Sequence, residues 1–149
     1  MQTRTFARLR EEPSRGSSDW LHVDHGRYAE WLTRLATGPE PFGLADAVVA
    51  AFVRIVTNAR LWHPATEPAT ALEFVARLRR RRACRVLTSG SASWPIFTRL
   101  VEATSARGKL VADAWLAALV MEHACTLATC DGDFARFPDL RWMHPLKTG

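Results

Sequence analysis

The chain has 149 residues, 48% of them hydrophobic and six of them tryptophan, with a formal net charge of +5 and a pI near 9.9. This length fits one domain, and the apolar content excludes wholesale disorder. Because no run of roughly 18 apolar residues occurs, and the charged start lacks an apolar segment after it, we expect a cytoplasmic protein without a membrane span or signal peptide. Three cysteines without a CxxC pair, Cys84, Cys125 and Cys130, indicate buried thiols rather than disulfides or a zinc site.

The first residues differ in character from the rest of the chain. Residues 1–20 read MQTRTFARLREEPSRGSSDW, a basic and polar arm that ends in a Pro-, Ser- and Gly-rich linker and that we expect to be disordered. No apolar run in this arm is long enough for a buried parallel strand, which is usually almost continuous in Val, Ile and Leu. We therefore expect the folded domain to span residues 21–149.

Apolar periodicity in that domain predicts an α/β fold. Helices are expected over residues 22–36, 44–56, 69–82 and 93–104, and from 109 onward, and a Pro-rich turn precedes the second of them. Short strands are expected over residues 84–87, 124–129 and 140–146, the last at a sheet edge. Trp94 is expected in the core, because apolar neighbours share its helix face.

This arrangement predicts the positions of three aspartates that could form a functional site. Asp113 is predicted in the first turn of its helix, where the helix dipole favours an acid. Asp131 and Asp133 directly follow the strand over 124–129, at the end where α/β folds place ligand-binding groups. A helix-start charge for Asp113 and a capped turn for Asp131 and Asp133 are the structural alternatives.

Carboxylates that converge on one sheet edge repel each other unless a cation lies between them. Mg²⁺ and Mn²⁺ prefer such oxygen ligands and keep several bound waters. A cation of this kind lowers the pKa of a bound water and stabilises charge on a phosphate, so phosphodiester hydrolysis is the chemistry that the acids favour.

The arginine-rich run at residues 77–82 is a candidate binding surface for a polyanion. It lies at the end of the helix over 69–82, where cations also suit the helix dipole, so a solvated helix end explains part of it. The high net charge nevertheless favours RNA, because phosphate contacts release counterions. The residues that we predict to hold the RNA backbone are Arg54, Arg79, Arg80, Arg81 and Arg82.

The stretch LVADAWLAALVMEHACTLATCDGDFARFPDLRWMHPL resembles the C-terminal half of PIN-domain ribonucleases, in particular the VapC-type toxins of bacterial toxin-antitoxin pairs. EPFGLADAVVAAFVRIVTNARLW and RVLTSGSASWPIFTRLV are similar to upstream parts of the same toxins, so the resemblance covers roughly residues 28–146. It implies a PIN-like three-layer α/β/α domain with a short, mostly parallel sheet.

The resemblance also implies roles for individual acids. Asp113 matches the family's helix-borne acid, Asp131 the acid that closes the later strand, and Asp133 the second Asp of a D-x-D-F run, which is more often a supporting residue. Relatives of the form GLSELVLSGFLRV carry an acid six residues before a Phe, which Asp46 before Phe52 matches. These four acids are the implied ligands of Mg²⁺ or Mn²⁺, with Asp113, Asp131 and Asp46 catalytic.

The N-terminus departs from the family pattern. Family members open with a strand of the form LLLDTNVLLYA, which lies at the centre of the sheet and supplies the first acid. Counted in residues along the sequence from Tyr28, that acid would fall near Arg10. Glu11 and Glu12 lie close by, but their segment reads as a charged helix or as disordered, so neither is assigned the role. We therefore expect the central first strand to be lost or replaced, through a frameshift or a misassigned start.

Two hypotheses follow from the resemblance and this departure. The first is a Mg²⁺- or Mn²⁺-dependent endoribonuclease, the toxin of a type II toxin-antitoxin system, which forms a homodimer and binds a small antitoxin protein. The alternative is a catalytically impaired PIN-like remnant that acts only as an antitoxin-binding or dimerisation module. The missing strand and its acid favour the alternative.

Overall fold

A parallel sheet of short strands organises the fold. The computed structural model describes residues 4–6 and 25–147, and within them the sheet has five strands in the order β3-β2-β1-β4-β5, each pair of neighbours parallel. The strands are β1 (Arg4–Phe6), β2 (Phe42–Ala45), β3 (Cys84–Leu87), β4 (Thr126–Ala128) and β5 (Trp142–Met143).

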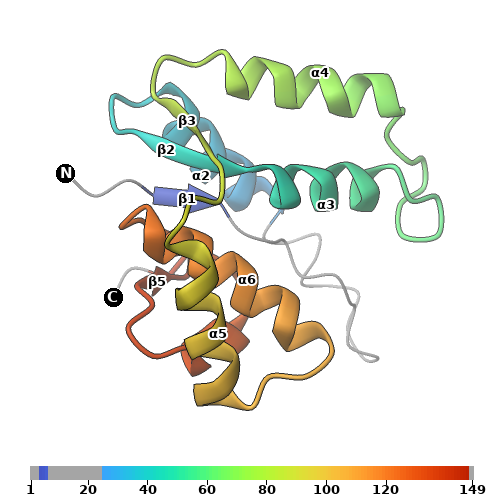
Figure 1. The fold of residues 1–149 in the computed structure, drawn as a ribbon. Helices are drawn as coiled ribbons and strands as arrows, with labels where there is room; N and C mark the ends of the chain where they lie inside the picture. The colour runs from blue at the N-terminus through green and yellow to red at the C-terminus, as the bar shows by residue number, and fades with distance from the viewer. Residues whose placement is uncertain (1–3, 7–24, 148–149) are drawn as a thin grey trace.

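Helices connect these strands and cover the sheet. In Figure 1, α3 and α4 lie together at one side of the sheet and α5 and α6 lie together at the other. No helix in residues 25–147 is both long enough and apolar enough to cross a membrane. The helices are α2 (His25–Thr37), α3 (Asp46–Val56), α4 (Pro68–Arg79), α5 (Ser93–Thr104), α6 (Lys109–Glu122) and the short 3-10 helix η1 (Gly132–Arg136).

Alternation along β2 divides the core into two parts. Phe42 and Leu44 point to one face, where they pack with Leu35 of α2. Ala45, on the opposite face, belongs to a larger cluster that contains Leu87 of β3 and the buried residues of α5, α6 and β4. Two packed faces on one sheet make the predicted three-layer α/β/α domain, so the expected fold class is confirmed.

The central strand, which was expected to be lost or replaced, is present as a short strand without the family's apolar run. β1 lies at the centre of the sheet, where Arg4 is in register with Phe42 of β2 and with Thr126 of β4. A three-residue strand between two neighbours is held by backbone hydrogen bonds on both sides, which do not require a long apolar run. The remainder of the predicted disordered arm, residues 1–3 and 7–20, lies outside the described residues.

The second strand was missed altogether. Residues 42–45 were expected to form a turn and the start of a helix, but all four are buried in β2, and the helix begins at Asp46. A buried run of four apolar residues has no periodicity that separates a strand from a helix. By contrast, β3 and α5 have the predicted bounds, Cys84–Leu87 and Ser93–Thr104.

Trp94 also differs from expectation. Its side chain is 63% exposed at the start of α5, so the prediction of a core position was wrong. Phe97, one helical turn further on, contacts both Trp94 and Trp115 of α6, with ring centroids 5.7 and 5.3 Å away. Of the three predicted buried thiols, only Cys125 is fully buried, and Cys84 and Cys130 are partly exposed.

The core of the α5–α6 layer can be tested with a pair of leucines. Leu100 is fully buried, whereas Leu72 of α4 is 57% exposed. We expect Leu100→Ala to lower the free energy of unfolding by about 2–5 kcal/mol, because it removes apolar burial and leaves a cavity. Leu72→Ala should change it by less than about 0.5 kcal/mol. Urea denaturation measures both, and equal losses would contradict this assignment of the core.

Candidate active site

Two of the predicted acids follow strands at the carboxyl edge of the parallel sheet. β2 ends at Ala45 and is followed at once by Asp46, while β4 ends at Ala128, three residues before Asp131. Since parallel strands all end at the same edge, their following loops lie together there. The sequence thereby delivers acids from separate segments to one side of the domain.

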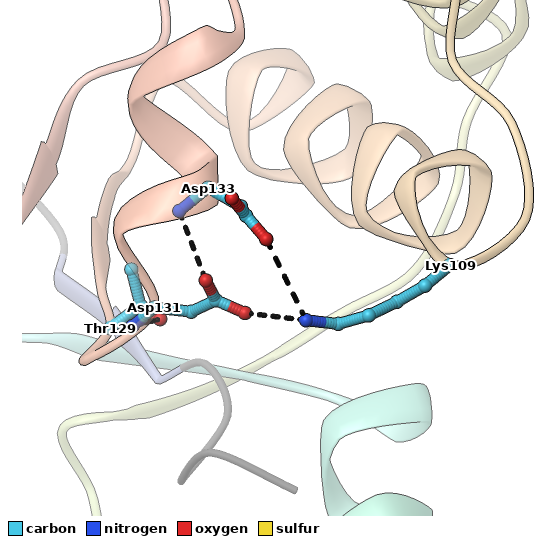
Figure 2. Close-up of polar contacts among 4 residues, drawn as sticks. All are labelled: Lys109, Thr129, Asp131 and Asp133. Atoms are coloured by element: carbon cyan, nitrogen blue, oxygen red, sulfur yellow. Dashed lines mark hydrogen bonds and ion pairs between the residues drawn. The ribbon is translucent and has the colours of Figure 1, made fainter. Parts of the chain in front are cut away.

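Asp131 is held by contacts to both of its carboxylate oxygens (Figure 2). Oδ1 accepts a hydrogen bond of 3.0 Å from the backbone N–H of Asp133, which caps η1, and Oδ2 lies 2.9 Å from Nζ of Lys109. The backbone N–H of Asp131 donates to Oγ1 of the buried Thr129 at 3.0 Å. The predicted alternative of a capped turn is therefore present, and the cap orients Oδ2 toward a cation.

Lys109 is the cation at this edge. It is the first residue of α6, and Gly108 before it has φ +55°, a conformation that favours glycine. The Nζ atom of Lys109 lies 2.9 Å from Oδ2 of Asp131 and 3.9 Å from Oδ2 of Asp133. Its side chain is 51% exposed, whereas that of Asp131 is buried. Figure 2 shows the ammonium between the two carboxylates.

Asp113 and Lys109 lie on the same face of α6. The two residues are four apart, so they share one side of α6. Asp113 is only 2% exposed and belongs to the second turn of α6 rather than the predicted first turn, whose residues include no acid. A helix-start charge therefore does not explain it, because the effect of the dipole falls off within the first turn.

Asp46 is engaged differently. Its exposed carboxylate accepts a hydrogen bond of 2.9 Å from Nη1 of Arg79, at the end of α4. Among the described residues, no group of three or more His, Cys, Asp or Glu side chains is close enough to hold a metal ion. The structure thus brings Asp131 and Asp133 together around Lys109, and it pairs Asp46 with an arginine.

The predicted RNA-binding arginines lie at the protein surface. Arg54 is exposed in the last turn of α3, and Arg79 ends α4. Exposed residues Arg80, Arg81 and Arg82 form the connection from α4 to β3.

The predicted acids offer oxygen atoms as possible metal ligands, although the described part of the chain does not bring three of them together. Asp113 and Asp131 are buried carboxylates, and the transfer of a carboxylate out of water costs several kcal/mol per ion before any partner compensates it. Lys109 already supplies one positive charge at Asp131, which marks this position as suited to a cation. Hard oxygen ligands from carboxylates are those that Mg²⁺ and Mn²⁺ prefer.

A carboxylate network at the other end of α6 from Lys109 was not predicted from the sequence. Glu122, the last residue of α6, accepts hydrogen bonds from the N–H groups of Gly90 and Ala92, at 2.8 and 3.0 Å, and from the hydroxyl of the buried Ser93. Glu122 therefore fastens the loop after β3, together with the Ser93 side chain at the start of α5, to the end of α6. The sequence gives no signal for this network, because Glu122 lies 32 and 30 residues away from Gly90 and Ala92.

This network makes stability depend on pH. The hydrogen bond from Ser93, followed by that from Gly90, lowers the pKa of Glu122 in the folded protein. A carboxyl whose pKa is lower folded than unfolded stabilises the fold above its unfolded pKa, and this contribution is lost as pH falls through the folded pKa.

We therefore expect Glu122→Gln to lower the urea midpoint at pH 7, with a difference from the wild type that shrinks as the pH is lowered to about 3. Unfolding curves across that range measure it. Glu102→Gln, an exposed glutamate of α5, is the control and should leave the midpoint unchanged at each pH. A deficit for Glu122→Gln that stayed constant with pH would contradict the role of its charge.

Comparisons with known proteins agree with this architecture. The model of the PIN domain family matches residues 19–140. The chain is 42% identical over 123 residues to ribonuclease VapC43 of Mycobacterium tuberculosis and to VapC ribonuclease Mb2897 of Mycobacterium bovis, and the match covers 83% of this chain and 84% of each relative. It is 31% identical over 124 residues to ribonuclease VapC25 of M. tuberculosis, across 83% of this chain and 87% of the relative.

Solved structures with the same fold have low sequence identity to the chain. VapBC-1 from nontypeable Haemophilus influenzae superposes with a TM-score of 0.65 at 12% identity, over 99% of this chain and 100% of the other. VapBC2 from Rickettsia felis, solved bound to a DNA fragment from its promoter, gives 0.60 at 14% identity, over 95% and 98%. At such identities the likeness concerns the fold.

Proposed function

Because the chain belongs to the PIN-domain family and, within it, to the VapC ribonucleases, we propose that it is the toxin endoribonuclease of a type II toxin-antitoxin system. In this proposal it hydrolyses phosphodiester bonds of RNA with the aid of Mg²⁺ or Mn²⁺, in the cytoplasm. The observation that carries the proposal is the meeting of a buried, capped carboxylate, Asp131, with a cation at the carboxyl edge of the sheet.

The proposed ligands of the divalent cation are Asp113 and Asp131, with Asp46 and Asp133 assisting. When bound, such a cation activates water and stabilises charge on the phosphate. The cap on Oδ1 fixes the direction of the Asp131 carboxylate, and burial shields Asp113 from bulk water. Asp46 would give up its ion pair with Arg79 in order to contact the cation, because exposed ion pairs of this kind contribute little stability.

The proposed substrate contacts are basic. The arginines from α3 to β3 and the net charge of +5 would attract the phosphate backbone by counterion release. Binding should therefore weaken steeply as the salt concentration rises. The contacts assigned to the backbone are Arg54, Arg79, Arg80, Arg81 and Arg82.

Asp113→Asn tests the metal site with little change in shape. We expect at least a roughly 100-fold loss of RNA cleavage, since even supporting residues of metal sites cost 10–100-fold. The melting temperature should stay near that of the wild type. Cleavage of labelled single-stranded RNA with Mg²⁺, with Mn²⁺ and with EDTA measures the activity.

The matched control is Asp139→Asn. Asp139 is exposed, pairs with Arg99 at 3.0 Å and has φ +66°, a conformation that asparagine tolerates. It should retain full activity. Unchanged cleavage by Asp113→Asn, or full wild-type cleavage in EDTA, would contradict the proposed site.

The proposed protein partners are a small antitoxin and a second copy of the chain. α3 is strongly apolar, yet none of its residues is fully buried, and Leu61 and Trp62 after it are exposed. We assign this surface, which adjoins Asp46, to the antitoxin, whose segment would then cover the acids. The aromatic surface of Trp94, Phe97 and Trp115 on α5 and α6 is assigned to the homodimer.

Trp94→Asp tests the second assignment. A charge on an apolar interface is costly to bury, so we expect the variant to elute as a monomer where the wild type elutes as a dimer. Light scattering with size-exclusion chromatography measures the mass. Leu72→Asp places the same charge on an exposed leucine of α4 and should leave the dimer intact. A dimeric Trp94→Asp would remove this surface from the interface.

A further inference from the structure

Lys109 stands out because its ammonium contacts two of the proposed metal ligands, Asp131 and Asp133. Nζ lies 2.9 Å from Oδ2 of Asp131, which is the oxygen left over after Oδ1 caps η1. It also lies 3.9 Å from Oδ2 of Asp133. The contact therefore engages the only oxygen of Asp131 that its capping role does not use.

The position of Lys109 in its helix is unfavourable by itself. It is the first residue of α6, at the helix end where backbone N–H groups carry partial positive charge and where acids are preferred over cations. No acid in the first turn of α6 compensates it. The carboxylates of Asp131 and Asp133 supply that compensation from outside the helix.

A divalent cation at Oδ2 of Asp131 would be repelled by this ammonium. Two positive charges on one carboxylate oxygen would lie a few ångströms apart, at a buried site where screening by water is weak. Half of the Lys109 side chain is exposed, so its flexible stem can carry the ammonium into solvent without a change in the backbone.

We infer that Lys109 is the resident counter-ion of the Asp131–Asp133 pair and that a divalent cation binds in competition with it, an inference that rests on the proposed metal-dependent activity. In the metal-free protein Lys109 neutralises Asp131. When the divalent cation binds, the ammonium leaves Asp131. Lys109 therefore sets how much free Mg²⁺ or Mn²⁺ the protein needs.

The first test is calorimetric titration of Mn²⁺ into the complete protein. Lys109→Met keeps the apolar stem and removes the charge, and we expect it to bind Mn²⁺ roughly three- to tenfold more tightly, the range for loss of a partly exposed ion pair and of repulsion in the bound state. The chain has one other lysine, Lys147, exposed near its C-terminus, so Lys147→Met is a control of identical chemistry. Its affinity should equal that of the wild type.

The second test follows the two lysines directly. In protein labelled with ¹³C-lysine, only Lys109 and Lys147 contribute side-chain ε-methylene signals. Saturating Mg²⁺ should move the Lys109 signal toward the position of a solvated lysine and leave the Lys147 signal in place. In Asp131→Asn the Lys109 signal should already lie at the solvated position without Mg²⁺.

The outcomes separate the two claims. If wild type binds Mn²⁺ and Asp131→Asn does not, the metal site stands, and equal or weaker affinity of Lys109→Met would then overturn the inference alone. A Lys109 signal that stays fixed at saturating Mg²⁺ would overturn it as well. Absence of Mn²⁺ binding in wild type and every variant would overturn both the inference and the proposed metal-dependent activity.

Discussion

Burial of negative charge at the carboxyl edge of the sheet is the constraint on which the other features depend. Asp131 and Asp113 are almost inaccessible to solvent, and each buried charge costs several kcal/mol unless a partner compensates it. The capping hydrogen bond to Asp131 and its contact with Lys109 supply part of that compensation. The start of α6 at Lys109 thus serves a local electrostatic need as well as helix formation.

The short strands make this edge possible. β1 is parallel to β2 and β4 and in register with them over only two and three residue pairs, so each chain segment leaves the sheet at the same side soon after it enters. The loop after β3 has separate support from Glu122, which accepts hydrogen bonds from the N–H groups of Gly90 and Ala92. Two residues of α6, Lys109 and Glu122, therefore hold the loops at opposite ends of one helix, and α6 is the element that organises the site.

Much of the fold could be predicted because its helices are long enough to show the helical repeat of apolar residues in the sequence. α5 and β3 have the expected bounds, and α6 begins at the expected Lys109. β1 and β2 could not be predicted in this way, because strands of three and four residues owe their place to neighbouring backbones. The burial of Trp94 was predicted wrongly, because the sequence does not show whether an apolar helix face is covered by another element.

The site was predictable at the level of residue types and only partly at the level of contacts. The strand that precedes Asp131 placed it correctly at the carboxyl edge, and spacing alone put Asp133 beside it. The roles of Lys109 and Glu122 depend on contacts 22 and 32 residues apart in the sequence, which no periodicity encodes. The pairing of Asp46 with Arg79 could not be predicted for the same reason, because the two residues are 33 apart in the sequence.

The alternative of a catalytically impaired remnant loses one of its two supports. It assumed that the sheet lacks its central strand, but β1 fills that place and pairs with β2 and β4. What remains is chemical: in the sequence, Phe6 of β1 is followed by Ala7 and Arg8, and the first acid comes at Glu11. Among the residues that the structure describes, the acids proposed for a divalent site come from α6, the β4–η1 turn and the start of α3. The ammonium of Lys109 contacts two of these acids, Asp131 and Asp133, so its charge bears directly on the metal affinity of the proposed site.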